Sequence, residues 1–236
     1  AAAEGNLDAL KALVRHGANV MANSSSGLTV MNTAAARNKT EVIDALVALG
    51  PSVNGEYEDD TSITPLHTAV RANSCDAIRS LAQHEANLNK LDHSSETPLQ
   101  LAVRFERVDA AEALLASGVN VNLRVNGETP LETLFEEEPS KDVLKVLLKA
   151  GAIVNIPDEN GMYPIQQAAK YVEDAEEMID LLVEAGADVN AGSGLHRSTP
   201  LHIACSKRNG SAVAALLRHG AATDVVDVDG NTPLHS

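Results

Sequence analysis

The sequence contains a repeated four-residue motif, and the spacing of its copies limits the possible folds more than any other feature. Thr-Pro-Leu followed by His, Gln or Glu occurs five times, and two degenerate copies fill the gaps. The copies begin at Thr29, Thr64, Thr97, Thr129, Tyr163, Thr199 and Thr232. Successive copies start 35, 33, 32, 34, 36 and 33 residues apart, and six of the nine prolines occupy the second position of a copy. A period of this size predicts a solenoid, in which each repeat buries its apolar face against the next.

Each repeat carries the signals of two helices and an extended segment. Thr before Pro supplies an N-cap oxygen and a first helical residue that needs no N–H, so the motif predicts the start of a short first helix. Apolar stripes with helical spacing, such as Val143, Val146 and Leu147, predict a second helix. A glycine suited to a left-handed C-cap ends the second helix in most repeats: Gly17, Gly50, Gly118, Gly151, Gly186 or Gly220. In the remaining repeat Glu85 takes the place of this glycine, at a cost on the order of 1 kcal/mol if it must be left-handed. An extended finger follows each second helix.

The period, the Thr-Pro-Leu-His motif, the Leu-Leu-x-x-Gly-Ala segments and the Val-Asn that follows them resemble the ankyrin repeat family over the whole chain. The resemblance implies an all-α fold, an ankyrin-type α-solenoid of stacked helix-turn-helix pairs with β-hairpin-like fingers. It also implies that the fingers and first helices line a concave groove. We expect one stack over residues 1–236, with repeats at 1–23, 24–58, 59–91, 92–123, 124–157, 158–193, 194–226 and 227–236. The first and last of these are truncated, so we expect a piece of a longer protein.

The charge and the cysteine content restrict the possible partners and the location. The chain carries 33 acidic and 18 basic residues, for a net charge of -15, and this balance argues against nucleic acid or an anionic membrane surface as a partner. The longest uncharged run, residues 17–36, contains several Asn, Ser and Thr residues and would insert poorly into a bilayer. The two cysteines, Cys75 and Cys205, form no disulfide framework, so we expect a reducing, cytoplasmic location.

No motif indicates catalysis, and we predict that the chain is not an enzyme. Nucleophile, phosphate-binding and zinc-binding motifs are absent from the sequence, so we expect no catalytic residue, no metal site and no cofactor. His67, His202 and His235 all occupy the fourth position of the motif. The family resemblance implies that such histidines bridge backbone groups of neighbouring fingers.

The resemblance also indicates which positions face the groove, namely two near the end of each first helix, such as Glu136 and Glu137, and those that flank the turn glycine. At these positions we predict that Arg37, Arg71, Arg104, Phe105, Lys170, Tyr171 and Lys207 bind a protein partner through an extended or acidic/mixed segment. Arg and aromatic side chains are enriched at interface hot spots. We expect Arg37, Arg71, Arg104 and Phe105 to form the basic and aromatic groove. A solvated helix face with random charges is the competing interpretation.

Several alternatives remain open at this stage. An acidic patch could instead receive a basic peptide; it comprises Glu56, Tyr57, Glu58, Asp59, Asp60, Glu136, Glu137 and Glu138. The leading function is a protein–protein interaction module, the adaptor or recruiting domain of a larger protein. A structural spacer or tether without a tight groove ligand is the second. A third is a substrate for asparaginyl hydroxylation, because Asn122, Asn155 and Asn190 each follow a Leu by eight residues, a context that resembles this modification in the family.

Overall fold

A computed structural model of the chain describes residues 1–236 apart from 26, 56–62, 137–138 and 193–196. The described residues form two compact units, Ala1–Asn120 and Val121–Ser236. Apart from one short 3-10 helix and the isolated bridge between Val125 and Glu128, the regular structure of these residues is α-helical, as predicted. The division into eight repeats of a single stack stays a prediction.

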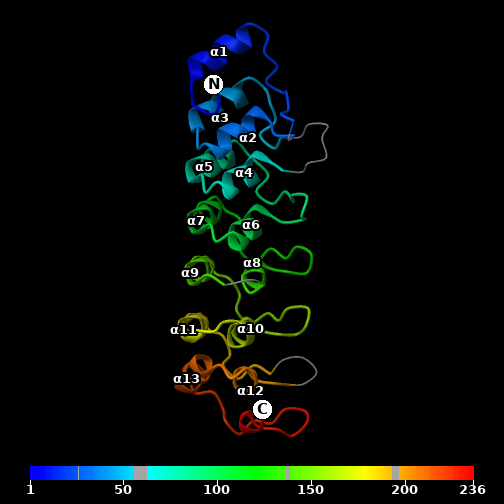
Figure 1. The fold of residues 1–236 in the computed structure, drawn as a ribbon, viewed down its shortest axis with the longest axis vertical. Coiled ribbons are helices and arrows are strands. Elements are labelled where there is room, and N and C mark those ends of the chain that lie inside the picture. Colours follow the sequence, from blue (N-terminus) through cyan, green and yellow to red (C-terminus); the bar gives the residue numbers. More distant parts are fainter. Residues whose placement is uncertain (26, 56–62, 137–138, 193–196) are drawn as a thin grey trace. The chain divides into compact units, whose positions relative to one another are not determined.

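Unit 1 contains three first helices and four second helices. The first helices are α2 (Val30–Ala36), α4 (Pro65–Arg71) and α6 (Pro98–Arg104). The second helices are α1 (Leu7–Arg15), α3 (Thr40–Ala48), α5 (Cys75–Gln83) and α7 (Val108–Ala116). Within the unit, the first helices follow one another in one column and the second helices in another, with the fingers projecting from the first-helix side (Figure 1).

Unit 2 repeats this arrangement. Its first helices are α8 (Pro130–Thr133), α10 (Pro164–Tyr171) and α12 (Pro200–Ser206), followed by the 3-10 helix η1 (Pro233–His235). Its second helices are α9 (Lys141–Lys149), α11 (Glu176–Glu184) and α13 (Gly210–Arg218). Among the described residues no helix is both long enough and apolar enough to cross a membrane.

The start of each first helix has the predicted chemistry. The Thr64 hydroxyl accepts the backbone N–H of His67 at 3.3 Å, and Thr97 and Thr129 cap α6 and α8 in the same way. Pro occupies the first helical position in all three helices, where a missing N–H leaves no partner unsatisfied. The motif therefore fixes the entry into the first helix.

The ends of the second helices also follow the prediction. Gly50, Gly118 and Gly186 have φ of 100, 93 and 92°, a left-handed conformation that glycine adopts without steric penalty. Glu85 occupies the same position after α5 with φ of 63°, so a side chain that disfavours this conformation is held in it. The conformational penalty on the order of 1 kcal/mol that we expected for a left-handed Glu85 therefore applies.

We expect Glu85→Gly to stabilise unit 1. Relief of the left-handed strain should exceed the larger entropy of glycine in the unfolded chain and raise the free energy of unfolding by about 0.5–1 kcal/mol. Urea denaturation followed by circular dichroism measures this change. Gly118→Glu, the reverse exchange at the equivalent position, should lower stability by a similar amount. A decrease for Glu85→Gly would contradict the strain argument.

Small and branched aliphatic side chains build the core of each unit. In unit 1, Ala69, Ile78 and Leu114 are fully buried between first and second helices. In unit 2, Leu144 and Ile179 are fully buried in the same way. Because these side chains are short, adjacent helices pack closely, which agrees with the scarcity of aromatic residues in the sequence.

One first helix is shorter than its motif suggests. We expected Glu136 and Glu137 near the end of a first helix, but α8 ends at Thr133. Phe135 N–H then bonds to Glu132 O and Glu136 N–H to Thr133 O, so the chain continues in tight i to i−3 turns. The physical reason is the burial of the Phe135 ring, which is only 4% exposed and turns the chain toward the core.

Asparagines tie neighbouring repeats together at two levels. In the helix–helix turns of unit 1, Asn73 Oδ1 accepts the Ala110 N–H at 3.0 Å and its Nδ2 donates to Asp109. In the fingers of unit 2, Asn155 Oδ1 accepts the Asp188 N–H at 3.0 Å while its Nδ2 donates to the Gly186 carbonyl. These contacts set the register between repeats within each unit.

Candidate functional site

The predicted basic and aromatic residues all lie at the C-terminal ends of first helices. Arg71, Arg104, Lys170 and Tyr171 belong to the last turns of α4, α6 and α10, whereas Arg37, Phe105 and Lys207 are the C-caps of α2, α6 and α12. They are the seventh or eighth residues after the first residue of a motif. We call Arg37, Arg71, Arg104 and Phe105 the unit 1 row, and Lys170, Tyr171 and Lys207 the unit 2 row.

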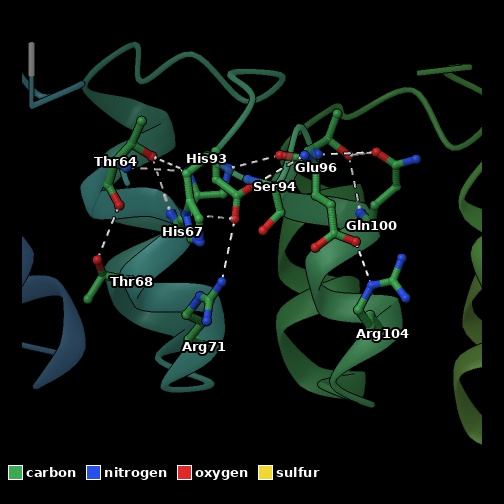
Figure 2. Close-up of polar contacts among 11 residues, drawn as sticks. Thr64, His67, Thr68, Arg71, His93, Ser94, Glu96, Gln100 and Arg104 are labelled. Carbon is green, nitrogen blue, oxygen red and sulfur yellow. Dashed lines mark hydrogen bonds and ion pairs between the residues drawn. The ribbon is translucent and has the colours of Figure 1, made fainter. Parts of the chain in front are cut away.

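In the unit 1 row, Arg71 already has an acidic partner. Its guanidinium lies 3.4 Å from the carboxylate of Asp92, whose side chain is fully buried, and 5.3 Å from the centre of the Phe105 ring. Asp92 also accepts the N–H groups of Ser94 and Glu96, which closes the turn of the finger. Figure 2 shows Arg71 reaching toward this finger.

Arg104 is paired in a comparable way. Its Nε lies 2.5 Å from Glu96 Oε1, on the finger that leads into α6, and the two side chains are only 27% and 14% exposed (Figure 2). The two arginines of the predicted basic groove are thus present at the expected place, but finger carboxylates largely neutralise them. Arg37, by contrast, is exposed at the end of α2.

The unit 2 row has a different electrostatic setting. Lys170 Nζ lies 4.5 Å from the centre of the Tyr171 ring and 3.8 Å from the sulfur of Met162. The Tyr171 side chain is 54% exposed, and Lys207 is exposed at the end of the next first helix. A cation–π contact at an exposed site contributes on the order of 0.5–1 kcal/mol. It leaves the ammonium able to bind an anion.

The predicted acidic patch falls mainly outside the described residues. This applies to Glu56, Tyr57, Glu58, Asp59, Asp60, Glu137 and Glu138. Glu136 is described, and it is exposed just beyond the end of α8.

His67 and His202 have the structural role that the resemblance implies, whereas the exposed His235 contacts Thr232 in its own motif. His67 Nδ1 lies 2.8 Å from the Thr64 hydroxyl and Nε2 lies 3.3 Å from the Glu96 carbonyl on the next finger (Figure 2). His202 bridges Thr199 and the Asn231 carbonyl in unit 2. Burial lowers the pKa of His67, because the charged imidazolium loses its hydration, although nearby Asp92 opposes this effect.

The pKa of His67 predicts an acid-sensitive contribution to stability. A histidine whose pKa is lower in the folded state binds its proton preferentially when unfolded, so its contribution is present above about pH 6.5 and is lost as the pH falls toward the folded pKa. We expect His67→Gln to lose less stability than the wild type between pH 7.5 and 5, because Gln100 shows that an amide can fill this position without titrating. Parallel urea denaturations at both pH values test this, and an identical pH dependence would contradict it.

An ion pair between a buried carboxylate and a half-exposed arginine in unit 2 was not predicted from the sequence. Glu132, the fourth residue of its motif, is 4% exposed, and its Oε1 lies 2.7 Å from an Arg124 nitrogen. Glu132 Oε2 also accepts the Thr129 N–H at 2.5 Å. Arg124 in turn donates to the carbonyls of Gly127 and Pro157, so it links two successive fingers. The sequence signal for this pair was the acidic residue Glu132 at the fourth motif position, where other copies have His.

A second network that was not predicted lies on the second helices of unit 2. Glu177 on α11 pairs with Lys141 and Lys145 of α9, at 3.2 and 2.7 Å. Asp180 on α11 pairs with Arg218, the last residue of α13, and with His219, the C-cap of α13. The hydrogen bond from His219 lowers the pKa of Asp180. These side chains are exposed or half-exposed, and surface pairs of this kind contribute little individually. The network links the three second helices of unit 2 to one another.

No group of three or more His, Cys, Asp or Glu side chains in the described part of the chain could hold a metal ion. Burial raises the pKa of both the Cys75 and Cys205 thiols, which disfavours the reactive thiolate form.

Comparisons with known proteins agree with the repeat analysis. A family model described as ankyrin repeats, in three copies, matches residues 1–92, 56–125, 86–158 and 168–236. Among solved structures, the ankyrin repeat domain of Bcl-3 has a TM-score of 0.77 and 27% identity, covering 89% of this chain and 93% of that one. The human ASB11 ankyrin repeat domain has a TM-score of 0.72 and 28% identity, covering 94% and 96%.

Among curated proteins, the chain is similar to parts of much longer molecules. It is 26% identical over 230 residues to the putative palmitoyltransferase ZDHHC13 of Danio rerio, covering 98% of this chain but 30% of that protein. It is 34% identical over 212 residues to the neurogenic locus notch homolog protein 1 of Mus musculus, covering 89% of this chain and 7% of that protein. The chain thus spans less than a third of the length of these two relatives.

Proposed function

Because the chain belongs to the ankyrin repeat family, whose domains generally mediate protein–protein interactions, we propose that it is an interaction module that binds a partner protein at the C-terminal ends of its first helices. In this role it acts as the adaptor or recruiting domain of a larger protein.

One observation carries this proposal. In both units an exposed aromatic ring occupies the eighth position after the start of a motif and lies beside a cation: Phe105 beside Arg71 and Tyr171 beside Lys170. The two rings are 42% and 54% exposed, although the chain has only five aromatic residues in all. An exposed ring next to a cation loses little conformational entropy on binding and offers both apolar and polar contacts. The cation comes from the preceding first helix in unit 1 and from the same helix in unit 2, yet each unit presents an exposed ring beside a cation, which favours a contact surface over a helix face with random charges.

Site-specific crosslinking tests the proposal. We would place the photoreactive residue p-benzoylphenylalanine at Phe105 or at Tyr171, and irradiate the protein in extract from its native cells. Matched controls carry the same residue at Glu112 on α7 or Lys149 on α9, which are exposed positions on second helices. We expect a discrete protein adduct from the first-helix positions and none from the controls. Adducts from the second-helix positions alone would contradict the proposal, and no adduct at any position would favour the spacer or tether.

Asparaginyl hydroxylation remains a second candidate with its own test. Asn155 and Asn190 are exposed on the fingers of unit 2. The leucines eight residues upstream, Leu147 and Leu182, are fully buried. An enzyme that reads those leucines would therefore act on an opened repeat. Intact-mass analysis of native protein tests for hydroxylation, because each hydroxylation adds about 16 Da. Absence of the added mass would exclude the hydroxylation candidate.

A further inference from the structure

We propose that Lys170, Tyr171 and Lys207 form the binding site for an acidic segment of the partner protein, in preference to the unit 1 row. This inference rests on the proposed function and assigns it to one half of the chain and one ligand chemistry.

Equivalent positions in the two units differ in the residue that contacts the basic side chain. Lys170 is the seventh residue after the start of its motif, as Arg104 is in unit 1. Glu96 and Met162 each directly precede the motif and each contact this basic residue, at 2.5 Å and 3.8 Å respectively. Unit 2 therefore has a contact between the same two repeat positions as the Arg104–Glu96 pair, but with an uncharged thioether in place of the carboxylate. The positive charge of Lys170 is left without the internal anion that neutralises Arg104.

Within the described parts of the chain, no carboxylate lies within 4.0 Å of the ammonium of Lys170 or of Lys207. Glu173 and Asp174 follow Tyr171 in the next turn and are exposed, yet neither reaches these lysines. A carboxylate from a partner would meet charges that the fold has not already satisfied.

Arg71 and Arg104 of the unit 1 row lack this property, because each already pairs with a finger carboxylate. An acidic ligand at Arg71 would have to compete with Asp92, a fully buried carboxylate held by two backbone N–H groups. Removing the arginine from that carboxylate would leave a buried charge unpaired, which is strongly unfavourable. Charge complementarity therefore favours the unit 2 row.

The spacing of the two lysines suits an extended chain. Helices α10 and α12 pack side by side within unit 2 (Figure 1), and packed helices lie roughly 8–10 Å apart. In an extended peptide of polyproline II conformation, which has three residues per turn and a rise of about 3.1 Å per residue, residues three positions apart share a face and are separated by about 9 Å. Two acidic residues at this spacing could each reach one lysine, and an apolar residue between them could contact the exposed Tyr171 ring.

Binding of an acidic segment to Lys170, Tyr171 and Lys207 can be tested with a peptide of defined sequence, without knowledge of the natural partner. The probe is the peptide acetyl-Gly-Glu-Leu-Leu-Glu-Gly-amide, and the control peptide carries Gln in place of both Glu. Each is titrated into the full chain labelled with 15N, and backbone amide shifts are followed by NMR. We expect saturable shifts at 170–171 and 207 with the acidic peptide, and shifts at least about fivefold smaller with the control at equal concentration.

A matched pair of variants tests the role of the missing carboxylate. Met162→Glu restores the acidic residue found at the equivalent position in unit 1, whereas Met162→Gln has the same size without the charge. We expect Met162→Glu to weaken binding of the acidic peptide about fivefold and Met162→Gln to change it less than about twofold. Circular dichroism checks that both variants fold.

The outcomes separate this inference from the proposed function. Shifts centred on Arg71 and Phe105, or equal weakening by both Met162 variants, would overturn the inference while leaving first-helix binding intact. The absence of saturable shifts at 170–171 and 207 would overturn it too. The proposed function itself fails only if crosslinking occurs solely from the second helices or from no position.

Discussion

Replacing Arg124 with Ala should destabilise unit 2 by about 2 kcal/mol, because it leaves the nearly buried carboxylate of Glu132 without its counter-charge. Loss of a partner from a fully buried ion pair costs more, about 3–5 kcal/mol. The Arg124 side chain is 37% exposed, however, so water reduces the penalty. Arg124 also bonds to the carbonyls of Gly127 and Pro157, and part of the loss comes from those contacts. Urea denaturation followed by circular dichroism, together with hydrogen exchange at the Thr129 amide, measures the change.

The double variant Arg124→Ala with Glu132→Gln provides the decisive control. Gln166 occupies the position of Glu132 in a neighbouring repeat of unit 2, where its oxygen accepts the Tyr163 N–H and its Nε2 donates to two finger carbonyls. A neutral amide therefore suits the site. We expect the double variant to recover more than half of the loss, which gives a favourable coupling energy between the two residues of about 1 kcal/mol. Equal destabilisation in the single and double variants would mean that the bonds of Arg124 to the fingers, and not the buried charge, dominate.

The regular parts of the fold were predictable because each is specified within a few residues. Thr64 and Pro65 determine the start of α4 through an N-cap bond and a fixed φ, and neither requires knowledge of distant residues. Glu85 illustrates the same point, since its left-handed backbone followed from its place between a helix and a finger. The start of α8 was predicted in the same way, but its early end was not, because that end depends on burial of Phe135, a tertiary effect.

The positions of the candidate site were predictable, but their charge state was not. The motif register placed Arg71, Arg104 and Lys170 at the ends of first helices, where the structure has them. Whether each cation is neutralised depends on the finger residue that folds back against it: Asp92, Glu96 or Met162. Those residues are 8 to 21 positions away in the sequence, and only the conformation of the finger brings them into contact. The net charge of -15 gave no information about this local balance.

Replacing His67 with Ala should destabilise unit 1 by about 3 kcal/mol, the largest effect of a single change that we expect. The imidazole is fully buried, so its removal leaves a cavity and takes away the acceptor of the Thr64 N–H. The Thr64 hydroxyl and the Glu96 carbonyl each lose one hydrogen bond as well, although each keeps a bond to a backbone N–H. Unsatisfied polar groups in a buried site add to the loss of packing. Urea denaturation at pH 7.5, where the imidazole of the wild type is neutral, measures the difference in the free energy of unfolding.

The variant His67→Gln distinguishes the contribution of the hydrogen bonds to stability from the contribution of the ring's packing volume. Gln100, at the same position of the next repeat, bonds to the N–H and hydroxyl of Thr97 at 3.1 Å each, so an amide can reproduce the cap. We expect this variant to lose less than about 1 kcal/mol, because the helix start and the bridge to the next finger are both kept. If His67→Gln were as unstable as His67→Ala, the shape of the ring would matter more than its bonds. The fourth motif position would then tolerate Gln only where the packing of the surrounding repeat suits an amide. His and Gln at this position could then not be exchanged between repeats, although both side chains bridge neighbouring fingers.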